Sequence, residues 1–288
     1  MNDNYKINGC EHSMHDNQLF LKDANYFPEF QTELNNFKNL INTLVSQNIS
    51  KTFVHFGDGD YYFLKKIPIG SAKPGNRALS IGYKNFNIQP YREGWLKNDY
   101  HCVEYLECGN KDKLNELFPN LNTIPTEFLY GLTMNKWFLK TFQNKISLIG
   151  GHNKIQLIKK LMDNKEYQNY LGLEKFNDYI TIPEKFACDN LENTINLVKT
   201  QLEQCSSETR IFLFGVGHVK SGLVHHFTKF KNAIYLDIGA GIDAIAGLID
   251  QDRPYANNWT NYRLKDHNYN NIDLLNYDVN IDKNIKWI

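Results

Sequence analysis

The apolar positions in the first part of the chain follow a helical spacing and then a strand spacing. From residue 30 to 47 they recur every three or four residues, at Phe30, Leu34, Phe37, Leu40, Ile41, Leu44 and Val45. This spacing predicts an amphipathic helix. The next apolar run, Thr52–Phe56, is short, β-branched and aromatic, and it predicts a strand that ends in the glycine-containing segment 57–60. A second helix is expected from Tyr61 to Lys66.

The pattern becomes regular again from Lys145 onward. Four apolar runs predict buried strands, at residues 146–151, 180–183, 211–214 and 233–239. Amphipathic stretches between and after them predict helices at 153–162, 191–202 and 221–230. The intervening section, 67–125, is rich in Gly, Pro and Asn and predicts loops with one or two helices.

Apolar strands that are each followed by a glycine-rich turn and a helix are typical of a parallel sheet covered on both faces. We therefore expect an α/β fold, a single Rossmann-like domain over residues 29–288. Residues 1–28 are polar and without periodicity, and they predict an extension at the surface. Ligands of such sheets bind at the carboxyl ends of the strands, so the glycine-rich segments after the strands should share one rim.

Composition excludes several classes of function. The chain of 288 residues has 32 Lys and Arg against 32 Asp and Glu, a formal net charge of +0, so the cationic excess of nonspecific nucleic-acid binders is missing. No apolar run is long enough to cross a bilayer, and the first residues lack the features of a secretory signal, which predicts a cytoplasmic protein. The 5 cysteines are scattered and indicate reduced thiols.

The segment from Gly57 to Asp60 carries the most informative chemistry. Asp58 and Asp60 lie two residues apart after a strand, with Gly59 between them. Both carboxylates can supply oxygen ligands to Mg²⁺ or Mn²⁺, which would in turn offset the charge of a diphosphate. A solvated Asp-Gly turn explains the same spacing.

Two further glycine-rich segments follow strands. Gly215 and Gly217 would let backbone N–H groups approach a phosphate, and Lys220 would add positive charge, although a plain strand-to-helix turn also fits. Asp237 opens a segment that resembles the cofactor loop of S-adenosylmethionine methyltransferases, and Asp243 in it is a candidate general base or a helix N-cap.

Two loops rich in cations and rings complete the candidate chemistry. One contains Lys73 and Arg77, and the other, residues 253–263, begins with Arg253 and combines arginines with amides and aromatic rings. Guanidinium groups pair with phosphate oxygens and rings stack on bases or sugars, so both loops could face a ligand. A surface loop held by its aromatic residues is the alternative.

These segments together resemble the GT-D fold glycosyltransferases, a bacterial family with a strand that runs into a motif like R-F-G-D-G-E. Residues 55–60, His-Phe-Gly-Asp-Gly-Asp, are similar to that motif, and the strands at 145–150, 180–183, 211–217 and 236–243 fit the later elements in order. Asp60 replaces the family's Glu, and His55 replaces a frequent Arg. The resemblance covers about residues 35–250.

The resemblance implies transfer of a sugar from a nucleotide-sugar donor, a UDP-sugar, to a hydroxyl of a glycan or glycoprotein acceptor. Asp58 and Asp60 would hold Mn²⁺ or Mg²⁺, Asp60 would be part of the catalytic centre, and Asp243 would act as base near the acceptor hydroxyl. The donor would be bound by Gly57, Lys73, Arg77, Gly215, Gly217, Lys220, Asp237 and Arg253. Two other functions stay open: a Rossmann-like methyltransferase, and a relative that binds a nucleotide or glycan without catalysis.

Overall fold

The architecture is taken from a computed structural model that describes residues 12–15, 18–21, 30–67, 87–105, 109–133, 137–184, 187–249, 259–269, 272 and 285–288. Seven strands form one sheet in the order β5-β4-β3-β9-β8-β6-β7, and every neighbouring pair is parallel. The predicted parallel α/β sheet is thereby confirmed. The strands are β3 (Lys51–Phe56), β4 (Tyr100–Val103), β5 (Thr123–Pro125), β6 (Ile146–Gly151), β7 (Tyr179–Ile182), β8 (Ile211–Gly215) and β9 (Ile234–Asp237).

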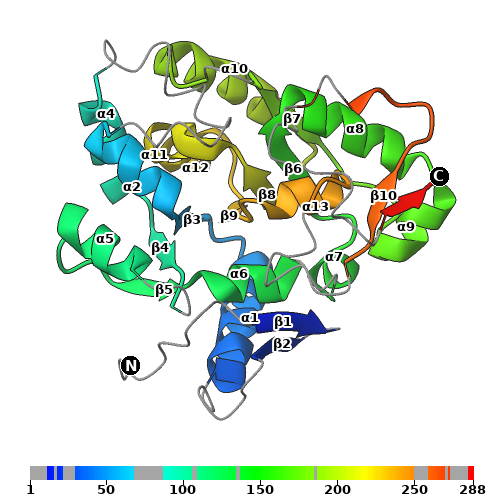
Figure 1. Ribbon diagram of the computed structural model, residues 1–288, viewed down its shortest axis with the longest axis horizontal. Coiled ribbons are helices and arrows are strands. Elements are labelled where there is room, and N and C mark those ends of the chain that lie inside the picture. The colour runs from blue at the N-terminus through cyan, green and yellow to red at the C-terminus, as the bar shows by residue number, and fades with distance from the viewer. Residues whose placement is uncertain are drawn as a thin grey trace.

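Helices cover both faces of this sheet, as the pattern predicts (Figure 1). On one face Phe53, Leu148 and Leu213 pack with the helices α1 (Phe30–Ser46), α6 (Thr126–Thr133), α7 (Trp137–Thr141), α8 (His152–Met162), α9 (Lys165–Leu171) and α13 (Gly241–Ile245). On the other face Val54, Ile149 and Phe214 pack with α2 (Asp58–Lys65), α4 (Gln89–Leu96), α5 (Asn110–Leu117), α10 (Leu191–Glu203), α11 (Lys220–Leu223) and α12 (Phe227–Phe230). Adjacent strand residues such as Phe53 and Val54 point to opposite faces, which is the period of a strand buried on both sides.

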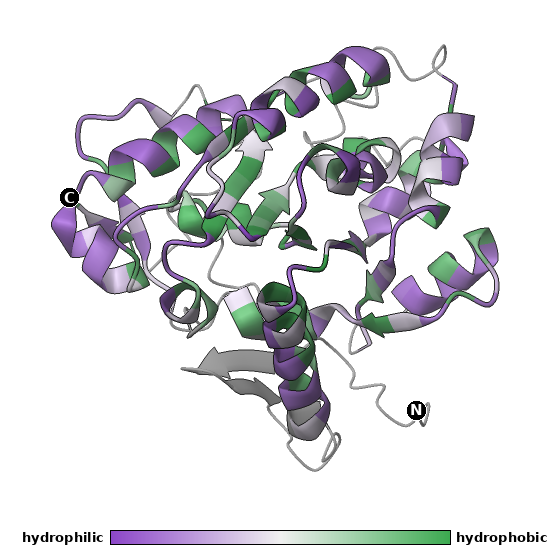
Figure 2. Cartoon of the chain, turned by 180° about the vertical axis from the view of Figure 1, so that it is seen from behind, coloured by the Kyte–Doolittle hydropathy of each residue, from purple (hydrophilic) through white to green (hydrophobic). Residues whose placement is uncertain are grey.

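The hydropathy of the ribbon agrees with this layering. In Figure 2 the central strands are hydrophobic, while several flanking helices have one hydrophobic side and one hydrophilic side. The long helix α1, for example, buries Leu34, Ile41 and Leu44 and exposes the residues between them. Burial of such a stripe stabilises a helix more than its intrinsic propensity does.

Several elements differ from the sequence prediction. The section predicted as loops with helices, 67–125, contains two strands of the sheet, β4 and β5, besides α4 and α5. Helix α2 begins at Asp58 and not at Tyr61, and the helix predicted at 221–230 is divided into α11, the 3₁₀ turn Val224–His226, and α12. Within the predicted extension the strands β1 (His12–His15) and β2 (Gln18–Leu21) pair as a hairpin, and β2 contacts α6.

The last described strands form a separate unit. β10 (Asn261–Arg263) and β11 (Ile285–Trp287) pair with each other in parallel and do not join the main sheet. Among the described strands, β9 is therefore the last in chain order to enter the main sheet, and it lies between β3 and β8.

Candidate active site at the strand carboxyl ends

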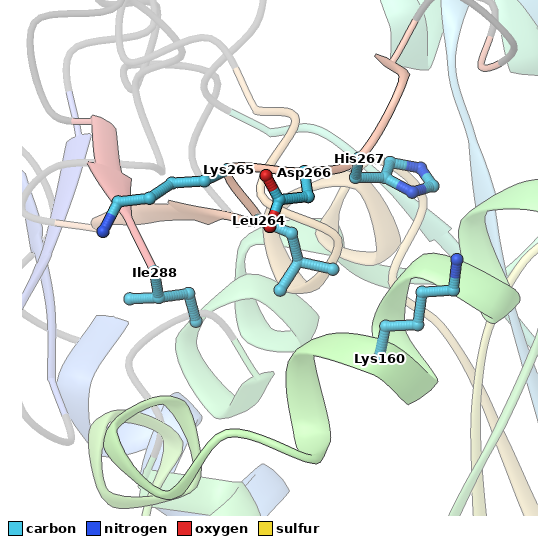
Figure 3. Close-up of a pocket in the computed structure, with 6 residues that line it drawn as sticks. All are labelled: Lys160, Leu264, Lys265, Asp266, His267 and Ile288. Carbon is cyan, nitrogen blue, oxygen red and sulfur yellow. The ribbon is translucent and has the colours of Figure 1, made fainter.

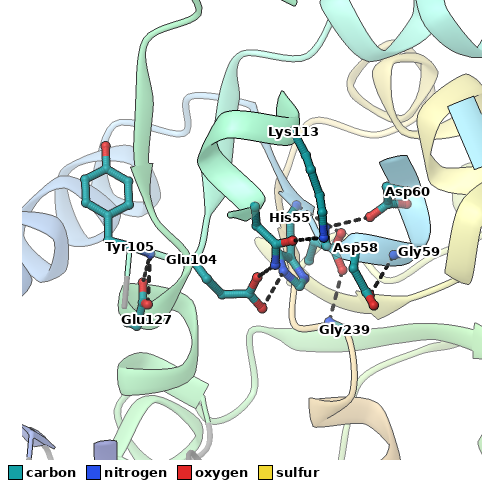
Figure 4. Close-up of polar contacts among 12 residues, drawn as sticks. His55, Asp58, Gly59, Asp60, Glu104, Tyr105, Lys113, Glu127 and Gly239 are labelled. Atoms are coloured by element: carbon teal, nitrogen blue, oxygen red, sulfur yellow. Dashed lines mark hydrogen bonds and ion pairs between the residues drawn. The ribbon is translucent and has the colours of Figure 1, made fainter. Parts of the chain in front are cut away.

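The candidate site lies where β4, β3, β9 and β8 end. These four strands are successive neighbours in the sheet and are all parallel, so the residues that follow them meet at one rim. Figure 4 shows the polar side chains that gather there. Which of these side chains come into contact depends on the order of the strands in the sheet, and not on their order along the sequence.

The Asp58 and Asp60 pair lies in the first turn of helix α2. Gly57 is the N-cap residue, and Asp60 Oδ2 accepts a hydrogen bond of 3.0 Å from the Gly57 backbone N–H. Asp58 Oδ1 accepts one of 2.7 Å from the Gly59 N–H. Carboxylates in this position are favoured because the helix dipole and the free N–H groups attract negative charge. Asp58 is exposed and Asp60 is buried, so the two carboxylates occupy different environments.

Lys220 joins Asp60 to Asp237. Its Nζ lies 3.0 Å from Asp60 Oδ2 and 3.0 Å from Asp237 Oδ2, and the three side chains are 7%, 5% and 1% exposed. Asp237 also accepts hydrogen bonds from the backbone N–H groups of His55 (3.1 Å) and Gly239 (3.0 Å). The ammonium therefore ties the ends of β3 and β9 to the segment that follows β8.

The charges of this cluster hold each other in place. Burial alone would raise the pKa of Asp60, but the nearby charges of Lys220 and His218 hold that pKa below its ordinary value. Burial alone would lower the pKa of Lys220, but Asp237 and Asp60 raise it. The Lys220 ammonium thus lies between the carboxyl groups of Asp60 and Asp237.

His218 closes the cluster from the segment after β8. Its Nδ1 lies 3.4 Å from Asp60 Oδ1, and its ring stacks on Phe63 at a centroid distance of 5.2 Å. A Cβ atom on Gly59 would lie 2.8 Å from Cε1 of His218. Gly59 therefore lets the His218 ring approach the first turn of α2.

His55 and Glu104 form a second charged pair beside this cluster. His55 Nε2 lies 3.1 Å from Glu104 Oε1, both side chains are 12% exposed, and Glu104 Oε2 accepts a hydrogen bond of 2.6 Å from Asn110 Nδ2. Burial would lower the pKa of His55, but Glu104 raises it; burial would raise the pKa of Glu104, but His55 lowers it. Sequence reasoning missed Glu104 because it did not find β4, the strand that places it.

The glycines predicted to approach a nucleotide have different surroundings. A Cβ on Gly215 would lie 2.6 Å from the Gly239 carbonyl oxygen, so this glycine lets the end of β8 pack against the segment after β9. Gly217 has φ +62° and open space around its Cβ position, and a Cβ on Gly57 would meet only atoms at 3.6 Å or more. Gly57 is partly exposed and Gly217 is exposed, so both leave space at the surface of the rim.

The other predicted site residues lie elsewhere. Asp243 is on α13, and its Oδ1 is 2.6 Å from Lys154 Nζ on α8, so its carboxylate has a cationic partner. Lys73, Arg77 and Arg253 lie outside the described residues. The structure thus brings together Asp60, Lys220 and Asp237 among the predicted residues, with Asp58 and Gly57 at their border.

Of the two carboxylates predicted to bind a divalent cation, only that of Asp58 is exposed at the rim. Asp60 already contacts Lys220 and His218 through its two oxygens, whereas Asp58 is exposed at the rim. Within the described ranges no group of three or more His, Cys, Asp or Glu residues is arranged as a metal site. Mg²⁺ is commonly held by one or two carboxylates together with substrate phosphates and water. A cation at this rim would therefore bind Asp58 and take its other ligands from water or from a bound molecule.

A pocket of about 270 Å³ lies away from the rim (Figure 3). Its lining comes from Lys160, in the last turns of α8, and from the segment after β10, including His267, together with Ile288. Helix α8 starts at the rim and runs away from it, so Lys160 lies roughly 12 Å along the helix from its first residue. Burial and Lys160 lower the pKa of His267.

No described helix has the length and apolar character needed to span a membrane. Comparison of the sequence with protein-family models and with curated proteins gives no match. Among solved structures the chain is similar to a glycosyltransferase (DUF1792) from Streptococcus sanguinis, with 15% sequence identity and a TM-score of 0.44. The similarity covers 87% of this chain and 92% of that chain.

Proposed function

We propose that the protein is a glycosyltransferase that moves a sugar from a UDP-sugar to a hydroxyl of a glycan or glycoprotein acceptor. The observation that carries the proposal is the rim itself. The motif of residues 55–60, which resembles the metal motif of the GT-D family, lies at the carboxyl end of β3, with Asp58 exposed and Asp60 paired with the buried ammonium of Lys220. This is the edge at which open α/β sheets bind their ligands.

The exposed carboxylate of Asp58 bears directly on a diphosphate ligand. Two anions at one edge repel each other unless a cation lies between them. Asp58 would hold Mn²⁺ or Mg²⁺, and the cation when bound would offset the charge on the leaving diphosphate. Gly57 and Gly217 would border the bound donor, because both leave space at the rim.

Asp60, Lys220 and Asp237 have a supporting part in this proposal. Lys220 forms buried ion pairs with both Asp60 and Asp237. These contacts would fix the first turn of α2 relative to the segments that follow β8 and β9. Preorganised charge of this kind does not need to rearrange during a reaction. Lys73, Arg77 and Arg253 stay predicted donor contacts, and Asp243 stays a predicted base.

The methyltransferase alternative assigns the cofactor to the segment from Asp237 to Gly241. Asp237 is 1% exposed and accepts hydrogen bonds or charge from His55, Gly239 and Lys220, so its carboxylate is engaged inside the protein. That engagement disfavours Asp237 as a cofactor contact. The second alternative, a binding module without turnover, differs only in the absence of transfer or hydrolysis.

A ligand screen separates these functions. Thermal unfolding would be followed with UDP, UDP-glucose, UDP-galactose, UDP-N-acetylglucosamine and S-adenosylmethionine, each with and without Mn²⁺, since a ligand of the native state raises the unfolding temperature. Stabilisation by UDP or UDP-sugars, with release of UDP from a UDP-sugar, supports the proposal. Stabilisation by S-adenosylmethionine alone would contradict it, and binding without UDP release would favour the binding module.

A further inference from the structure

The pair formed by His55 and Glu104 has a geometry suited to proton transfer. Glu104 accepts from His55 Nε2 at 3.1 Å, and its second oxygen is held by Asn110, whose side chain is buried. When Nε2–H donates to a carboxylate, the neutral imidazole carries its lone pair on Nδ1. Glu104 therefore determines which ring nitrogen can accept a proton.

Nδ1 of His55 lies beside Gly239, in the segment that follows β9. A Cβ atom built on Gly239 would lie 3.4 Å from His55 Nδ1, and no other described atom would lie within 4 Å of it. Gly239 has φ +47°, a conformation that favours glycine, so the space of about one methyl group beside Nδ1 stays open. No hydrogen bond to Nδ1 from another described residue occurs.

The ring is also adjacent to the proposed donor position. Cε1 of His55 lies 3.6 Å from the Cβ position of Gly57, the residue that precedes Asp58. An acceptor hydroxyl that attacks a sugar attached to a diphosphate at Asp58 would therefore come close to His55. Figure 4 shows His55 and Asp58 in one close-up, with Glu104 on the far side of the imidazole from α2.

Three of the predicted site carboxylates, Asp60, Asp237 and Asp243, are engaged by cations. Asp60 and Asp237 share Lys220, and Asp243 pairs with Lys154. A general base works best when it is unprotonated yet basic near the operating pH, which suits an imidazole oriented by a carboxylate.

We propose that His55 is the catalytic base that takes the proton of the acceptor hydroxyl, with Glu104 as its positioning residue; this rests on the proposed function. As the acceptor oxygen forms its bond to the anomeric carbon, its O–H bond breaks and the proton moves to His55 Nδ1. The bond from the anomeric carbon to the diphosphate oxygen breaks, and UDP leaves with that electron pair. Glu104 then balances the charge of the imidazolium.

The first test is the rate of UDP release from the UDP-sugar that the screen identifies, for the wild type and for His55→Gln, Glu104→Gln and the control His226→Gln. His226 is a half-buried histidine on the 3₁₀ turn before α12, outside the rim. We expect a loss of about 10²–10⁴-fold for His55→Gln and a control within about twofold of the wild type.

The pH profile separates a proton-transfer role from a structural one. The charged groups that act on His55 are Glu104, Lys220 and Asp237, and the Tyr130 ring packs edge-on against the imidazole. Because Glu104 raises the pKa of His55, the wild-type rate should rise with pH as His55 loses its proton. Glu104→Gln should move this acid limb to lower pH, and His55→Gln should remove it.

A measurement on the unmodified protein covers the case in which a variant does not fold. Nitrogen NMR of the histidine rings over a series of pH values should show that the neutral form of His55, reached as the pH rises, carries its proton on Nε2. A His55 ring protonated on Nδ1 alone would overturn the inference, as would a His55→Gln variant with the wild-type rate and acid limb. If the wild type neither binds UDP-sugars nor releases UDP, the proposed function fails and this inference with it; loss in Asp243→Asn alone would return the role to Asp243.

Discussion

Lys220 and Asp60 form a buried ion pair, with 3.0 Å between Nζ and Oδ2, although one follows β8 and the other follows β3. The two strands are not neighbours, because β9 lies between them. The same ammonium reaches Asp237 at the end of β9, so a single cation spans three strand ends. Removal of a buried charge that has two partners is costly, because both partners are then left buried without an opposite charge.

Replacement of Lys220 by Met should strongly destabilise the fold. The variant would leave two buried carboxylates close together without a cation, and breaking a buried pair in this way costs roughly 3–5 kcal/mol of unfolding free energy. Urea unfolding at neutral pH would measure this. The matched variant Lys199→Met removes a lysine with a 48% exposed side chain and should change the unfolding free energy by less than about 0.5 kcal/mol. Equal effects of the two substitutions would contradict the structure.

Asp60 should make the protein sensitive to acid. Its pKa is lower in the folded protein than its ordinary value, so the unfolded state binds more protons on acidification. The stabilisation is complete above an ordinary carboxyl pKa of about 4 and is lost as the pH falls toward the folded value. Asp60→Asn should be less stable than the wild type at pH 6, and its stability should vary less between pH 5 and pH 3.

The control for this prediction is Asp58→Asn, because Asp58 is in the same helical turn but exposed. Urea unfolding at a series of pH values should give the wild-type acid dependence for that variant. A wild-type dependence in Asp60→Asn as well would show that Asp60 does not interact with Lys220 as described.

The long apolar patterns predicted much of the fold correctly. The prediction of a helix over 30–47 is confirmed by α1, and the prediction of a strand over 211–214 is confirmed by β8. In both elements the buried positions are apolar over enough consecutive residues for the spacing to be recognised in a single sequence. The strands β4 and β5 have only 4 and 3 residues and include His and Pro, so their pattern is too short to distinguish them from loops.

The partners at the rim were less predictable for a different reason. The position of Lys220 after a strand was evident, but its contact with Asp60 depends on the order β3-β9-β8, which no local pattern encodes. Glu104 was missed together with β4. The offset of α2 by three residues matters most, because it places Asp58 and Asp60 in a helical turn, where one faces solvent and the other the interior.

The two glycines Gly215 and Gly57 should respond differently to alanine. A methyl group on Gly215 would come within 2.6 Å of the Gly239 carbonyl oxygen, and because backbone cannot move aside easily we expect a loss of about 1–3 kcal/mol in unfolding free energy. Gly57 is extended, at φ −111°, and its added methyl would make only ordinary contacts. Gly57→Ala should therefore keep wild-type stability in urea unfolding while it weakens UDP binding, measured by calorimetry. A destabilised Gly57→Ala with unchanged UDP affinity would argue against Gly57 as part of the donor site.

Asp58 should decide how the protein responds to divalent cations. Its exposed carboxylate is the group proposed to meet a cation that arrives with the diphosphate, whereas Asp60 is held by Lys220. In thermal unfolding, Mn²⁺ should increase the stabilisation by UDP in the wild type, and Asp58→Asn should remove that increase but keep part of the stabilisation by UDP alone. Asp112→Asn, an exposed aspartate in the first turn of α5, is the matched control and should behave as the wild type. Excess EDTA should abolish UDP release from a UDP-sugar. Release that persists in EDTA, together with an unchanged Mn²⁺ response in Asp58→Asn, would remove the divalent cation from the proposed reaction.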